Sequence, residues 1–135
     1  MKSEKIVTPS SAVLDASGAI FILSSNIILE TLGDYNYILS PEIFKYEIGN
    51  VCLKFSRYSD LSKEESKAYF ERSMEITALA NHFDFKRTIK CAEELDLSFY
   101  DASYLELALS TNSDLITRDK KLNHAAQKIG IETCF

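Results

Sequence analysis

Four acidic residues of this chain lie at the ends of apolar segments or inside them: Asp15, Glu47, Asp101 and Asp119. Carboxylates ordinarily occupy the solvent face of a protein. Gathering them in a partly apolar place is costly unless a positive charge joins them. A hard divalent cation prefers oxygen ligands and would supply that charge. The four acids therefore suggest a metal-dependent site, provided that the fold brings them together.

Each acid also has a structural explanation. Asp15 and Asp119 stand where helix N-caps are expected, and Asp101 lies in a first helical turn, where the helix dipole favours a negative charge. Glu47 shares the inward face of its helix with apolar residues, and a glutamate in that position is rarely left unpaired. Capping and metal binding are compatible, so both readings stay open for the three aspartates.

The composition is that of one soluble domain. The chain has 135 residues, of which 46% are hydrophobic and 26% charged. Its four Gly and two Pro are too few for a β-rich design with frequent turns. The formal net charge of −5 gives no overall attraction to nucleic acid, although a local basic rim is compatible with it.

Cysteine usage and the apolar segments indicate a cytoplasmic protein. The three cysteines are odd in number and widely spaced, which fits buried thiols in a reducing compartment. The first residues are polar and lack the apolar core of a signal peptide. The longest apolar stretch, residues 19–32, is interrupted by polar side chains and is too short to span a bilayer.

Strands and helices alternate along the chain, which predicts a parallel sheet covered on both faces. Strands are expected at residues 12–14, 37–39, 114–117 and 131–134. Helices are expected from residue 16, at 27–32, from a Ser40–Pro41 cap to 55, from Ser62 to Leu79, from Asp84 to 96, after Ser98 and at 120–128. Ser17 is expected to pair with the first free N–H groups of the first helix. In the helix after Ser98, the residues expected to face inward are Ala102, Leu105, Ala108 and Leu109.

We expect residues 1–10 to form a flexible segment and residues 11–135 a single domain. Ligands of parallel sheets bind beyond the carboxyl ends of the strands. Asp15 and Asp119 come directly after two predicted strands and should emerge at that edge.

Four segments in this order resemble the acidic motifs of PIN domains. They are residues 13–17 (VLDAS), 41–51 (PEIFKYEIGNV) with Glu47 as the acid, 99–108 (FYDASYLELA) and 115–122 (LITRDKKL). The third and fourth motifs are the specific ones, and the similarity extends over about residues 11–135. Two features depart from the family pattern: Ser17 stands where many members have Asn, and the chain begins with an extra polar segment.

The resemblance implies a three-layer α/β/α sandwich with a mainly parallel central sheet. Small single-domain members are mostly VapC-type toxins. The resemblance therefore also implies a Mg²⁺- or Mn²⁺-dependent endoribonuclease. Such an enzyme is inhibited by a VapB-type antitoxin and is usually a homodimer.

On this basis we assign hypothetical roles. Asp15, Asp101 and Asp119 would coordinate the metal directly or through water, and Glu47 would orient or deprotonate the attacking water. Ser17 and Thr117 would hold the carboxylates by hydrogen bonds. Five cations could grip RNA phosphates or could be solvated surface charges: Arg118, Lys120, Lys121, Lys54 and Arg57.

Three other interpretations are compatible with parts of this pattern. A catalytically silent PIN-like domain would bind RNA or protein without cleaving it. A phosphoacceptor receiver domain would need an acceptor Asp after a central strand, and residues 50–62 contain no such strand. A purely structural oligomerisation module would leave the four acids scattered over its surface.

Overall fold

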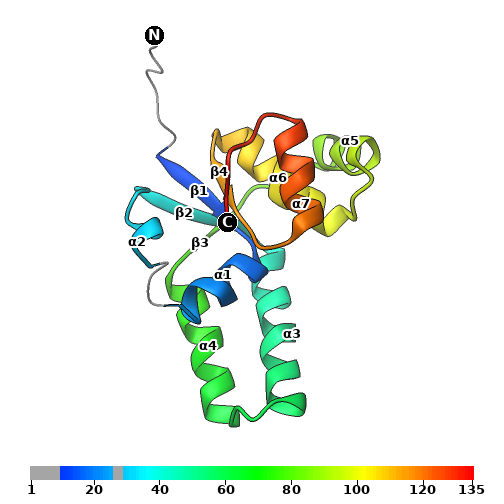
Figure 1. Ribbon diagram of the computed structural model, residues 1–135. Coiled ribbons are helices and arrows are strands. Elements are labelled where there is room, and N and C mark those ends of the chain that lie inside the picture. Colours follow the sequence, from blue (N-terminus) through cyan, green and yellow to red (C-terminus); the bar gives the residue numbers. More distant parts are fainter. Residues whose placement is uncertain (1–9, 26–28) are drawn as a thin grey trace.

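The computed structural model describes residues 10–25 and 29–135, and a five-stranded parallel sheet runs through its middle (Figure 1). The strands are β1 (Ser11–Leu14), β2 (Tyr37–Pro41), β3 (Ala78–Ala80), β4 (Asp114–Ile116) and β5 (Thr133–Cys134), in the order β3-β2-β1-β4-β5. All four residues of the central strand β1 are buried, as expected for a strand covered on both faces.

Helices cover both faces of this sheet. They are α1 (Ala16–Leu23), α2 (Leu29–Leu32), α3 (Ile43–Tyr58), α4 (Lys63–Glu75), α5 (Phe85–Leu95), α6 (Phe99–Thr111) and α7 (Lys120–Lys128). Helix α6 packs on β1, β2 and β4 with α5 against it, while α1, α3 and α4 contact one another. Figure 1 shows α5, α6 and α7 grouped on one side of the strands and α1, α3 and α4 on the other. The predicted three-layer α/β/α architecture is confirmed.

Side-chain caps set the beginnings of five helices. Asp15, Ser62, Asp84, Ser98 and Asp119 each accept a hydrogen bond from a backbone N–H in the first turn that follows. Ser62 and Glu65 form the predicted capping box. Asp15 and not Ser17 therefore caps α1. Two of the acids singled out in the sequence are thus fixed at helix N-termini.

Some expected boundaries are wrong. Ser40 and Pro41 belong to β2, where the Ser40 hydroxyl donates to the Leu14 carbonyl oxygen at 2.7 Å, so α3 begins later, at Ile43, without a side-chain cap. Helix α4 ends at Glu75, and Leu79 lies in β3 because the sheet edge beside β2 offers backbone hydrogen bonds to that segment.

In α6 Ala108 is buried as expected, but the expectation that Leu109 faces inward is wrong, because Leu109 is 52% exposed. Of the helix expected at 27–32, α2 covers Leu29–Leu32, and residues 26–28 lie outside the described residues. Nine residues of the segment expected to be flexible, 1–9, also lie outside them. In the part of the chain that the structure describes, no helix is long and apolar enough to cross a membrane.

Helix α1 crosses β4 at very close range, and the contact is made at Gly18. A Cβ atom at this position would lie 2.6 Å from the carbonyl oxygen of Ile116. Backbone atoms at the end of a central strand cannot move aside easily, so only glycine fits here. This contact fixes the distance between the residues that follow β1 and those that follow β4.

We therefore expect Gly18→Ala to lower the free energy of unfolding by about 1–3 kcal/mol, because the added methyl group overpacks a rigid contact. Urea denaturation would measure the change. Gly49→Ala is the matched control, since the nearest atom to a Cβ there is 3.9 Å away on the Phe70 ring. In the middle of α3 that substitution should stabilise by roughly 0.5–1 kcal/mol. Equal effects of the two substitutions would contradict the role given to Gly18.

Candidate functional site

The site lies where the strand order reverses. From β1 the chain adds β2 and β3 on one side, and β4 and β5 then form on the other side. The carboxyl ends of β1 and β4 therefore flank the crevice in which open α/β sheets bind ligands. Asp15 follows β1, and Thr117 and Asp119 follow β4. The two loops are joined directly, because the Asp15 N–H donates to the Ile116 carbonyl oxygen at 3.2 Å.

The Asp15 carboxylate is the most buried of the four acids, with 6% of the residue exposed. Its Oδ1 accepts hydrogen bonds of 2.8 Å from the Gly18 N–H and from the Ser17 hydroxyl. Its Oδ2 accepts a hydrogen bond from the hydroxyl of Thr117, which is fully buried. Both oxygens are therefore held in fixed directions.

The same hydroxyls also hold the loop after β4. The N–H of Asp119 donates to Thr117 Oγ1 at 3.0 Å, and the N–H of Arg118 donates to Ser17 Oγ at 2.9 Å. Ser17 and Thr117 are thus each bonded both to Asp15 and to the backbone leading to α7. These hydrogen bonds are compatible with the supporting role expected for Ser17 and Thr117, which stays a prediction.

One open cavity of about 600 Å³ is lined by all four acids. Asp15 enters it from the end of β1, Glu47 from α3, Asp101 from the first turn of α6, and Asp119 from the N-cap of α7. Its apolar wall includes Ile20, Val51 and Phe55. This arrangement contradicts the interpretation as a purely structural module, which requires scattered acids.

Burial and mutual repulsion raise the pKa values of three of these acids, Asp15, Glu47 and Asp101. Burial raises the pKa of Asp15 to about 6, although hydrogen bonds from Thr117, Gly18 and Ser17 oppose the shift and the charge of Asp119 adds to it. Burial also raises the pKa of Asp101, with a further contribution from Asp119 that Lys121 partly offsets. The pKa of Glu47 is raised by burial and by Asp101. The acids therefore act on one another across a single cavity.

The donor set of the cavity suits a hydrated magnesium ion. Within residues 10–25 and 29–135, no Lys, Arg or His side chain forms an ion pair with any of the four acids. In the same residues, no three His, Cys, Asp or Glu side chains come close enough together to enclose a metal ion. Mg²⁺ keeps several of its waters and is bound through one or two carboxylates, so carboxylates spread around a cavity fit it. A cation bound among these carboxylates would reduce the repulsion between them.

Sequence reasoning missed two polar residues of the cavity, Tyr104 and Asn50. The Tyr104 hydroxyl donates a hydrogen bond to Oε1 of Glu47, which opposes the rise in the glutamate pKa. Tyr104 follows Asp101 by three residues and Asn50 follows Glu47 by three. Residues at this spacing share a helix face, so the spacing alone could have identified both.

The cations proposed to contact RNA all lie on the surface. Lys120 and Lys121 are exposed in the first turn of α7, and Lys54 and Arg57 are exposed in the second half of α3. The Arg118 guanidinium lies over the Phe21 ring, 4.0 Å from its centroid. Of the five, Lys121 is close enough to Asp101 to lower the pKa of that carboxyl.

Comparison with known proteins gives a family match over most of the chain. The model of the PIN domain matches residues 12–128. The crystal structure of PAE2754 from Pyrobaculum aerophilum is similar with a TM-score of 0.76, at 20% identity over 91% of this chain and 90% of that chain. VapBC-1 from nontypeable Haemophilus influenzae is similar with a TM-score of 0.67, at 18% identity over 92% of this chain and 96% of that chain. A search of curated proteins finds no match.

The raised pKa of Asp15 predicts how stability depends on pH. Between the ordinary value of 3.8 and the folded value of about 6, the folded chain holds a proton that the unfolded chain has lost. The free energy of unfolding should therefore fall as pH rises through this window, with Asp15 contributing roughly 3 kcal/mol of the fall.

We expect the free energy of unfolding to fall less with rising pH in Asp15→Asn than in the unsubstituted protein. Urea denaturation at pH 4, 5, 6 and 7 without divalent cations would measure it. Asp60→Asn, at an exposed loop position outside the cavity, should leave the pH dependence unchanged. If the free energy of unfolding falls equally with and without the Asp15 carboxyl, this carboxyl does not cause the pH dependence.

Proposed function

The chain belongs to the PIN domain family, and from this membership we propose that it is a metal-dependent endoribonuclease acting as the toxin of a VapBC-type toxin–antitoxin pair. PIN domains are typically nucleases. The observation that carries the proposal is the cavity lined by Asp15, Glu47, Asp101 and Asp119, in which no described cation pairs with any acid. The fold similarity to VapBC-1 supports the toxin–antitoxin assignment.

In this proposal Asp15, Asp101 and Asp119 would hold one or two Mg²⁺ or Mn²⁺ ions, directly or through water. The ion would supply positive charge against the phosphate and against the charge that develops on it during cleavage. Ser17 and Thr117 keep the Asp15 oxygens in place, so that little reorganisation is needed when the ion binds. Oxygen ligands and retained waters fit both metals.

Glu47 takes the role of orienting or deprotonating the attacking water. Its Oε1 is held by Tyr104, and its raised pKa brings it nearer to the pH at which a general base is effective. The side chain enters the cavity from α3. The reaction breaks a phosphodiester bond of the RNA by addition of that water.

Substrate and partners follow from the same proposal. Lys120, Lys121 and Arg118 at the start of α7, with Lys54 and Arg57 on α3, would contact RNA phosphates at the rim. A VapB-type antitoxin would inhibit the enzyme, and the chain would form a homodimer. Its cysteines are free, which fits a cytoplasmic location.

We expect Asp101→Asn to lower the rate of RNA cleavage at least about a hundredfold while leaving the fold intact, because it removes a negative charge from the cavity but keeps the shape of the side chain. The measurement is cleavage of single-stranded RNA with Mn²⁺, and EDTA should abolish the activity of the unsubstituted protein.

Asp96→Asn is the matched control. Asp96 is exposed at the C-terminus of α5 in a left-handed conformation that Asn also tolerates, so this variant should keep full activity. Full activity of Asp101→Asn would refute the assignment of that residue. Binding of RNA without any cleavage by the unsubstituted protein would instead favour the silent binding module.

The toxin role predicts an effect in cells that depends on the same carboxyl. Induced expression in a bacterial host should stop growth with the unsubstituted protein and not with Asp101→Asn, because growth arrest requires RNA cleavage. A short neighbouring reading frame that encodes a DNA-binding antitoxin should restore growth when it is expressed with the toxin. Colony counts after induction measure both effects, and normal growth despite measurable nuclease activity would contradict the toxin role.

A further inference from the structure

A second pocket lies beside the acid-lined cavity, at the carboxyl ends of β2 and β3. Its volume is about 320 Å³. Pro41 at the end of β2, the segment after β3 and the first turns of α6 form its walls. None of the four acids lines it, so the proposed chemistry does not account for it.

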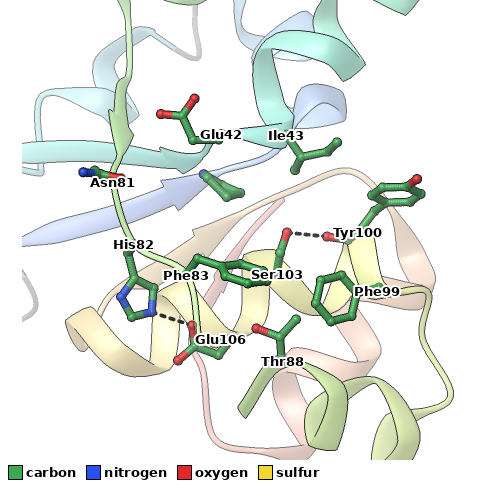
Figure 2. Close-up of a pocket in the computed structure, with 11 residues that line it drawn as sticks. Glu42, Ile43, Asn81, His82, Phe83, Thr88, Phe99, Tyr100, Ser103 and Glu106 are labelled. Atoms are coloured by element: carbon green, nitrogen blue, oxygen red, sulfur yellow. Dashed lines mark hydrogen bonds and ion pairs between the residues drawn. The ribbon is translucent and has the colours of Figure 1, made fainter. Parts of the chain in front are cut away.

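Aromatic rings make up one part of this pocket. Figure 2 shows Phe99 and Tyr100 at one end and the His82–Glu106 pair at the other, with the Phe83 ring between them. Phe83 is 71% exposed and Tyr100 59% exposed, although burying such rings is strongly favourable. Exposed aromatic rings around a pocket are typical of a binding site.

The other end of the pocket is polar, and its groups are joined by hydrogen bonds. Glu106 is 3% exposed, and its Oε1 lies 2.6 Å from Nε2 of His82. Its Oε2 accepts a hydrogen bond from the Ser110 hydroxyl. A carboxylate has about four acceptor positions, so two remain after these contacts. A buried acceptor with unused positions, facing flat apolar walls, suits a flat ligand with N–H donors on its edge.

The pocket and the acid-lined cavity share the helices α3 and α6. On α6, Tyr100 and Ser103 line the pocket, while Asp101 and Tyr104 line the cavity. On α3, Ile43 lines the pocket and Glu47, one turn later, lines the cavity. A single RNA strand whose phosphate lies among the acids would therefore have an adjacent nucleotide within reach of the pocket.

We propose that this pocket binds one unpaired base of the RNA substrate, beside the bond that is cleaved; the proposal rests on the nuclease function proposed above. The base stacks on the exposed rings of Phe83 and Tyr100, and its N–H edge faces Glu106 and His82. Every RNA base has a flat face for stacking and an N–H donor on its edge. Stacking requires no positive charge, which suits a protein with a net charge of −5.

The test uses the two histidines of the chain as reporters. Each of the four ribonucleoside monophosphates is titrated in EDTA, and the ring protons of both histidines are followed by NMR. We expect His82 to shift and His124 to stay unchanged, because His124 lies on α7 outside the pocket. Inorganic phosphate at the same concentration should shift neither, which separates the base from the phosphate.

Phe83→Ala should weaken the binding seen at His82 about tenfold, the size of one lost stacking contact. Phe85→Ala is the matched control, since Phe85 is also exposed and also packs on Phe99 but does not line the pocket. The absence of any His82 shift in the unsubstituted protein, or an equal shift in Phe83→Ala, would overturn the base site.

The remaining outcomes separate this proposal from the nuclease function. RNA cleavage without any His82 shift overturns the base site alone. A His82 shift that Phe83→Ala weakens, in a protein that cleaves no RNA with Mn²⁺, supports the base site and counts against the nuclease. If nucleotides leave His82 unchanged and Phe83→Ala converts a dimer into a monomer, the pocket is a contact between copies and the base site is wrong.

Discussion

The hydrogen bond from Thr117 to the carboxylate of Asp15 is the interaction on which the rest of the site depends. It joins residues that are 102 positions apart and that directly follow two neighbouring strands of the sheet. The close contact of Gly18 with Ile116 places the same two chain segments side by side. The cavity exists because these contacts hold the loop after β1 against the loop after β4, and the acids on α3 and α6 are then brought in by helices packed on the sheet.

Much of this arrangement could be predicted from the sequence, because the determining signals are local. A short apolar strand followed by an acid appears at both Asp15 and Asp119, and a parallel sheet places such positions at one edge. The caps at Ser62, Asp84 and Ser98 are chemical signals read within four residues. The predicted resemblance to PIN domains is confirmed by the family match over residues 12–128. The acids of its motifs line one cavity.

Features that depend on distant contacts could not be read in the same way. The segment Ala78–Leu79–Ala80 has no strand alternation and pairs with β2 only because that edge is free. Ser40 resembles a helix cap in sequence, but in the fold its hydroxyl bonds to Leu14 on the neighbouring strand. The His82–Glu106 pair joins residues 24 positions apart, and no local pattern indicates that a glutamate in the middle of α6 is buried.

The acids that the proposed function needs lower the stability of the folded protein when no cation is bound. Three of its acids have raised pKa values because of burial and of one another's charge, and no described Lys, Arg or His side chain forms an ion pair with them. An isolated protein would be more stable without this charge. Two of the acids lower the cost by capping α1 and α7, where the positive ends of the helices face them. At a pH above these pKa values, a bound cation would relieve the repulsion that remains, so the free energy that destabilises the ionised cavity would become affinity for the ion that the proposed reaction needs.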